Sequence, residues 1–143
     1  MIGLLNECLE KELLLLQTII DLSEEQQQIL VKFDLKAIET ITVRIENAML
    51  KLNEWSQKRI EIVANKLQIE QYEAKKLSFS DYQTYFGLED KDDLIKKSYA
   101  EKTKKMYSIN SVNRMLANRA SHSIKDMVSI MMSGNNNACN VKI

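Results

Sequence analysis

The chain has 143 residues, and its twenty basic side chains balance its twenty acidic side chains, so its formal net charge is zero. A neutral chain has no overall attraction to nucleic acid or to an anionic membrane, and no run of about eighteen apolar residues exists that could span a membrane. Proline is absent and glycine occurs three times, which favours one all-α domain over residues 1–143.

The two cysteines, Cys8 and Cys139, lie near opposite ends of the sequence. Neither has a second cysteine or a histidine at the spacing of a metal site or a redox motif. We therefore expect no metal and no cofactor. The early acids of the first segment are untypical of a secretory signal, so we place the protein in the cytoplasm.

Residues 2–31 have the pattern of a first long helix. Leucine and isoleucine recur at helical spacing, at Leu5, Leu9, Leu13, Leu16 and Ile20. The stripe is interrupted by polar residues near Ser23 and Gln27. Two interpretations stay open: an ordinary packed helix with a polar middle, or a site left free for a partner.

Residues 34–70 have the clearest periodicity and predict a second long helix. Its apolar residues step by three and four in a heptad pattern, at Ile38, Ile41, Ile45, Ala48, Leu52, Trp55 and Ile62, with one polar position at Arg59. Asp34 is a good N-cap. Because the break before it is short, the two helices should form an antiparallel hairpin. After Leu67 the helix could continue or fray.

Residues 78–87 contain four aromatic side chains. Ser80 and Gln83 have the spacing of a capping box and Gly87 that of a C-cap, which predicts a short helix over 80–87. The aromatic rings could close one end of a bundle or form a docking patch.

Residues 91–133 predict a third long helix, and the last segment, 134–143, should be a loose tail. Residues 94–125 carry eight basic side chains and one acid, whereas residues 1–31 carry six acids and one lysine. The first and third helices are therefore plausible neighbours. Lysines near tyrosines between Lys96 and Lys105 could suggest single-stranded nucleic acid, but pairing within the chain is the better interpretation. The whole pattern predicts an elongated antiparallel bundle of three long helices plus a short connecting helix.

The second half of this third helix has an apolar face rich in methionine. The face comprises Ile109, Val112, Leu116, Ala120, Ile124, Met127 and Met131. Methionine side chains adapt to differing partners, and nothing C-terminal remains to cover this end. The face is either core or a surface for a partner helix.

The sequence offers no catalytic constellation. The single histidine, His122, lies on the third helix without a nearby nucleophile, and a glycine-rich phosphate loop is missing. We therefore expect a protein that is not an enzyme.

Three features together resemble the FlgN-type flagellar export chaperones: the early leucine-rich helix, the second helix, and a last helix that contains asparagines and an arginine. The pattern of the second helix is echoed by Leu35, Ile38, Ile41, Met49, Leu50, Leu52 and Arg59, and that of the last helix by Asn110, Asn113, Leu116 and Arg119. The family often has an aromatic residue and a glycine in its tail, and residues 135–143 have neither.

The resemblance implies a cytoplasmic chaperone that keeps hook-associated junction proteins unassembled before type III export. It would bind their C-terminal helical segment through its own last helix and would meet the flagellar export apparatus. The residues expected to bind the client are Ile109, Val112, Asn113, Leu116, Ala120, Ile124, Met127 and Met131. The alternative is a homo-oligomeric coiled-coil protein, structural or regulatory, without a client.

Overall fold

A computed structural model describes residues 2–87 and 90–138, and within these ranges the regular structure is entirely helical. The helices are α1 (Ile2–Lys32), α2 (Leu35–Leu67), α3 (Gln71–Lys75), α4 (Phe79–Phe86) and α5 (Asp90–Ala138). The all-α prediction is confirmed for the described residues.

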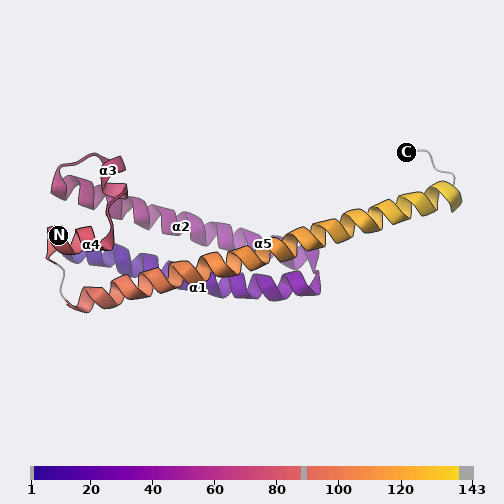
Figure 1. The fold of residues 1–143 in the computed structure, drawn as a ribbon, viewed down its shortest axis with the longest axis horizontal. Coiled ribbons are helices and arrows are strands. Elements are labelled where there is room, and N and C mark those ends of the chain that lie inside the picture. The colour runs from indigo at the N-terminus through magenta and orange to yellow at the C-terminus, as the bar shows by residue number, and fades with distance from the viewer. Residues whose placement is uncertain (1, 88–89, 139–143) are drawn as a thin grey trace.

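Helix α1 packs against both α2 and α5. It is antiparallel to α2, since Glu12 lies by Arg59 and Glu25 lies by Arg44. It is parallel to α5, since Glu12 contacts Tyr99, and Ser23, eleven residues further along α1, contacts Asn110, eleven residues further along α5. Figure 1 shows that α5 continues well past the turn between α1 and α2, which makes the molecule elongated. The predicted bundle therefore does not enclose the C-terminal part of α5.

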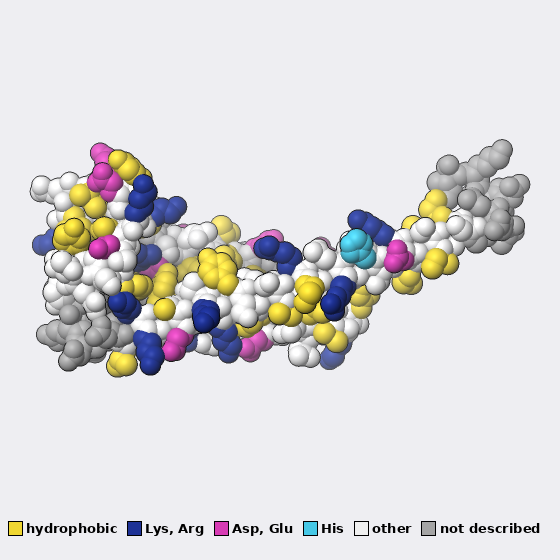
Figure 2. Space-filling model, viewed as in Figure 1, with side chains coloured by type: hydrophobic (Ala, Val, Ile, Leu, Met, Phe, Trp, Pro, Cys, Tyr) yellow, Lys and Arg dark blue, Asp and Glu magenta, His cyan; other side chains and the backbone are white. Residues whose placement is uncertain are grey.

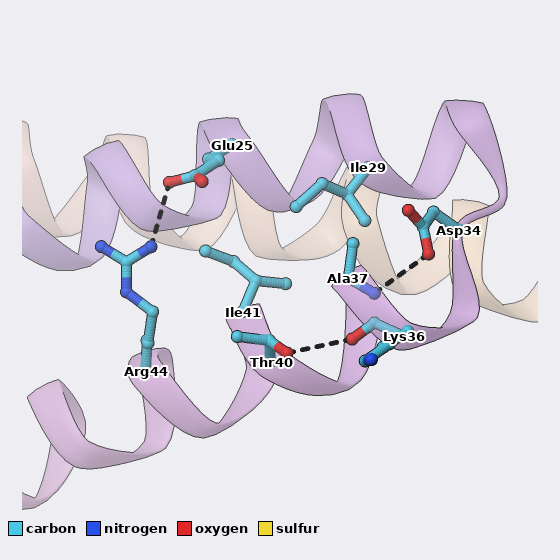
Figure 3. A pocket seen from close by; sticks show the side chains of 8 residues that line it. All are labelled: Glu25, Ile29, Asp34, Lys36, Ala37, Thr40, Ile41 and Arg44. Carbon is cyan, nitrogen blue, oxygen red and sulfur yellow. Dashed lines mark hydrogen bonds and ion pairs between the residues drawn. The ribbon is translucent and has the colours of Figure 1, made fainter.

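The turn between α1 and α2 is made by two residues (Figure 3). Phe33 adopts a left-handed conformation with φ of 62° and caps the end of α1. Asp34 then caps α2, as predicted, because its carboxylate accepts a hydrogen bond of 3.1 Å from the backbone N–H of Ala37. Glu25 and Arg44 form an exposed ion pair of 3.7 Å beside this turn. The Glu25–Arg44 pair thus connects α1 to α2 near the turn, while the Asp34 hydrogen bond stabilises the start of α2.

Two hydrophobic clusters form the core. The cluster at the N-terminal end of α1 contains Leu5, Leu9, Ile60, Val63, Ala64, Ala74, Tyr82 and Phe86, and the central cluster contains Leu16, Ile19, Ile20, Leu22, Ile41, Ala48, Leu52 and Met106. Tyr82 and Phe86 of the aromatic segment therefore close one end of the hairpin, whereas Tyr85 points outward and is 58% exposed.

The seam of α2 changes register along the helix. Ile41, Ala48 and Leu52 are buried as the heptad pattern predicts, but further on the buried residues are Ile60 and Val63. Trp55 and Ile62 of the predicted seam are only half-buried. A straight helix has 3.6 residues per turn, so a seam spaced every 3.5 residues drifts around it by about 20° per heptad.

Two predicted helix boundaries in the middle of the chain are corrected. Helix α2 ends at Leu67 rather than near residue 70, because Gln68 takes a left-handed C-cap conformation with φ of 55°. The short helix begins at Phe79, and its capping box is formed by Ser78 and Asp81, not by Ser80 and Gln83. The predicted Gly87 C-cap is present, with φ of 63°.

The last helix is also longer than predicted. It runs to Ala138 instead of ending at residue 133, so the first part of the expected loose tail is helical. One glycine, Gly134, costs a helix only about 1 kcal/mol, and no proline stops it. Residues 139–143 of the predicted tail lie outside the described residues.

Candidate interaction site

A groove of about 450 Å³ opens where α5 passes the turn of the hairpin. Its lining comes from the end of α1, the turn and the middle of α5: Leu30, Val31, Phe33, Leu116, Arg119, Ala120, Ser123 and Met127. The groove is mainly apolar, and Val31 and Met127 are 66% and 59% exposed. We call it the hairpin groove. The residues from the turn were missed by the sequence analysis, although Val31 and Phe33 are apolar residues at a helix end.

The eight residues predicted to bind a partner fall into three groups along α5. Ile109 and Asn113 face α1: Ile109 packs on the central core cluster, and Asn113 is buried. Val112, Leu116, Ala120 and Ile124 are half-buried. Met127 and Met131 are well exposed. The predicted face therefore starts inside the bundle and emerges from it toward the C-terminus.

The part of α5 beyond the hairpin exposes apolar side chains without cover from the described residues. Val128, Ile130 and Met131 are 48%, 71% and 61% exposed. Figure 2 shows hydrophobic side chains along this projecting segment. A cluster of exposed apolar side chains on one helix is typical of a surface that binds another protein.

A layer of polar side chains joins α1 to α5 just before the hairpin groove. Asn113 Nδ2 donates to the Ser23 carbonyl at 2.8 Å and to Gln26 Oε1 at 3.0 Å, and Ser23 Oγ lies 3.4 Å from Asn110 Oδ1. The polar middle of the first helix is thus packed within the chain.

A second polar cluster joins the three long helices deeper in the bundle. The carboxylate of Glu12 is fully buried and accepts hydrogen bonds from Arg59, Ser56 and Tyr99. Arg59 Nη1 also donates to the Tyr82 hydroxyl at 2.6 Å. Sequence reasoning missed Glu12, although its place between Leu9 and Leu16, in register with the apolar stripe, was a signal.

The electrostatics of this cluster favour a charged Arg59 and a neutral Tyr99. Burial alone would lower the pKa of Arg59, but the hydrogen bond and the negative charge of Glu12 raise it above its usual range. Burial, and then the charge of Glu12, raise the pKa of Tyr99 to about 12. Burial also raises the pKa of the Cys8 thiol, so this cysteine is a poor nucleophile.

No group of three or more His, Cys, Asp and Glu side chains among the described residues could hold a metal ion. None of the described helices has the length and apolar character to cross a membrane. The features of the site are its apolar surface and its shape, which are typical of helical proteins that bind other proteins.

Comparison with known proteins gives the family. The family model described as FlgN protein matches residues 1–140. The chain therefore belongs to the FlgN family, a family of flagellar export chaperones rather than of enzymes. No curated protein and no solved structure matches it.

Proposed function

We propose that this chain is a cytoplasmic export chaperone for hook-associated junction proteins and that it binds their C-terminal helical segment on α5. Family membership supports a flagellar export chaperone in general. The observation that supports the site is the apolar face of α5, which is half-buried at Leu116 in the hairpin groove and becomes exposed at Met127 and Met131.

The hairpin groove would receive one edge of the client helix. An amphipathic helix lays its apolar stripe into such a groove with anchors about three or four residues apart. Leu116 and Ala120 lie four residues apart on α5, and Met127 lies seven residues further along the same face. Val31 and Phe33 would close the groove from the side. Ile109 and Asn113 stay in the proposed set as the covered end of the face, reached if the client displaces the end of α1.

Covering the client's apolar stripe would prevent premature assembly of the junction proteins, since exposed apolar helices associate with one another. Release would then take place at the export apparatus, the second partner in this proposal. Methionine suits the role because Met127, Met131 and Met132 can repack around more than one client.

The test is calorimetric titration with the C-terminal helix of a hook-associated junction protein. Leu116→Asp with Met127→Asp places two carboxylates in the groove, and burying each unpaired charge should weaken binding by about 2 kcal/mol or more. The two charges together should lower the affinity for the client helix by about 1,000-fold. Val43→Asp with Leu50→Asp is the matched control, because both residues are exposed on α2, at 50% and 61%.

The double variant in the groove should keep its far-UV circular dichroism. Unchanged client affinity in this variant would refute the assigned face. Loss of helicity would show instead that Leu116 and Met127 belong to the core.

The second candidate is a homo-oligomer in which two copies cover each other's α5. The same exposed segment around Ile130 and Met131 favours it. Light scattering over a range of protein concentrations separates the two functions: a stable dimer that excludes the client helix supports the oligomer, and a monomer that binds the client supports the chaperone.

A further inference from the structure

A second groove, of about 680 Å³, lies between the start of α4 and the basic part of α5. Its floor is formed by Phe79, Tyr99, Ala100 and Tyr107, and Lys96 and Lys104 stand among its lining residues. We call it the α4–α5 groove. Tyr107 and Leu116 are nine residues apart, or about two and a half helical turns, so this groove and the hairpin groove open on opposite sides of α5.

The floor of the α4–α5 groove is preformed. The rings of Phe79 and Tyr99 pack on each other with centroids 5.2 Å apart and planes tilted by 57°. Phe79 is also held by an edge contact with Tyr82 at 5.8 Å, and the Tyr99 hydroxyl is anchored on Glu12 at 3.2 Å. Binding there would therefore cost little ordering of the floor.

The charge of the groove has one sign. Its described lining residues include two lysines and no carboxylate. Lys96 Nζ is positioned by the Ser80 hydroxyl at 3.0 Å. On the opposite flank, by contrast, Lys105 pairs with Glu24 at 3.3 Å and Lys102 bonds to Gln17, so the chain uses those lysines internally.

We propose that the α4–α5 groove docks an acidic amphipathic helix of a protein partner. Lys96 and Lys104 are eight residues apart on α5, which is about 12 Å along its axis. The partner helix would place carboxylates seven or eight residues apart over these lysines, with large apolar residues between them over Phe79, Ala100 and Tyr107. Because the two grooves face opposite ways, this helix docks together with any occupant of the hairpin groove.

Apolar contact would supply most of the binding free energy, and the two lysines would make binding selective for acidic helices. An exposed ion pair is worth at most about 1 kcal/mol, whereas like charges at the same positions repel, so acidic helices are favoured over basic ones. Nucleic acid fits less well, because Phe79 and Tyr99 are half-buried and contact each other at a tilt of 57°. Among the described lining residues this leaves Tyr107 as the exposed ring on which a base could stack.

The test uses a synthetic helix of about 18 residues with a leucine stripe and glutamates eight positions apart, labelled for fluorescence anisotropy. A second probe carries lysine in place of each glutamate. We expect the acidic probe to bind the full chain about tenfold or more tightly than the basic probe. A poly-dT oligonucleotide is the third probe.

Lys104→Glu with Tyr107→Ala reverses one charge and removes one apolar contact at exposed positions, and should weaken the binding of the acidic probe by about tenfold or more. Lys51→Glu with Leu50→Ala reverses one charge and truncates one exposed apolar side chain on α2, and should leave binding unchanged. Ala100→Trp, which fills the groove without changing its charge, should also weaken the probe by about tenfold.

Several results would overturn the proposal. They are equal affinity for the two helical probes, no binding of the acidic probe, or wild-type affinity in both groove variants. Binding of poly-dT that weakens steeply with salt would make the groove a nucleic-acid site instead. If the double variant Leu116→Asp with Met127→Asp no longer binds the acidic probe, the probe's site is the hairpin groove. If this variant still binds the acidic probe, the result supports the α4–α5 groove, whether or not the client proposal is correct.

Discussion

Arg59 of α2 holds Glu12 of α1 by two hydrogen bonds, from Nε to Oε2 at 2.8 Å and from Nη2 to Oε1 at 3.1 Å. The Glu12 side chain is fully buried, while that of Arg59 is 17% exposed. Ser56 and Tyr99 donate to the same carboxylate, so a single charge is shared by α1, α2 and α5. A satisfied polar network in a low dielectric holds the helices in one register.

Glu12→Ala should destabilise the fold by about 3–5 kcal/mol, because it leaves the guanidinium of Arg59 buried without its partner. The combined change Glu12→Leu with Arg59→Met should recover most of this loss, since apolar residues of similar volume often replace a buried ion pair without cost. Urea denaturation followed by circular dichroism measures both.

The control for the Glu12 prediction is Glu24→Ala, which breaks the exposed pair with Lys105 and should cost less than about 1 kcal/mol. Equal losses for Glu12→Ala and Glu24→Ala would contradict the structural role of the buried pair.

Stability should fall as pH rises from about 10, the ordinary pKa of tyrosine, toward 12. The pKa of Tyr99 is raised to about 12 in the folded chain, so between these values the unfolded chain loses a proton that the folded chain keeps. Below pH 10 both states are protonated and Tyr99 contributes no pH dependence. Alkaline urea denaturation should show a shallower decline for Tyr99→Phe.

Tyr85→Phe is the matched variant for the alkaline experiment, because the Tyr85 ring is 58% exposed. It should follow the wild-type curve. A decline that is identical in wild type and Tyr99→Phe would rule out the proposed cause.

Leu52→Asp should destabilise the fold by about 3 kcal/mol or more, because Leu52 is buried in the central core cluster and offers a carboxylate no partner. Ile45→Asp should cost less, since Ile45 is half-buried. Leu50→Asp, on the exposed side of α2, should change stability by about 0.5 kcal/mol or less. Thermal unfolding ranks the three variants, and no difference between Leu52→Asp and Leu50→Asp would show that the seam is exposed.

Asn113→Asp should cost about 2 kcal/mol or more, because a carboxylate is only an acceptor and would face two acceptors, the Ser23 carbonyl and Gln26 Oε1. Asn118→Asp changes an exposed residue one turn further on and should be nearly neutral. Chemical denaturation measures the free energy of unfolding of both variants. Equal values would show that the hydrogen bonds of Asn113 do not stabilise the packing of α1 against α5.

The sequence alone predicted the three long helices and some of their caps, because these depend on interactions between residues that are close in the chain. Asp34 as an N-cap and Gly87 as a C-cap act on their own backbone neighbours, so their roles could be predicted without knowing the packing. The lack of proline and the apolar periodicity likewise predicted an all-α chain, and the short break near Phe33 predicted the hairpin. The methionine-rich face of the last helix was also visible, because it is a property of one helix.

Tertiary structure decided which of these faces meet. The burial of Glu12 and Asn113 depends on a partner side chain from another helix, and no local pattern names that partner. A helical repeat of about 3.6 residues lets the α2 seam drift, but the burial of Ile60 also needs the side chains of Leu5 and Tyr82, which come from two other helices. The hairpin groove combines Phe33 with Met127, 94 residues apart in the sequence, and only the packing of α5 along α1 brings them to one surface.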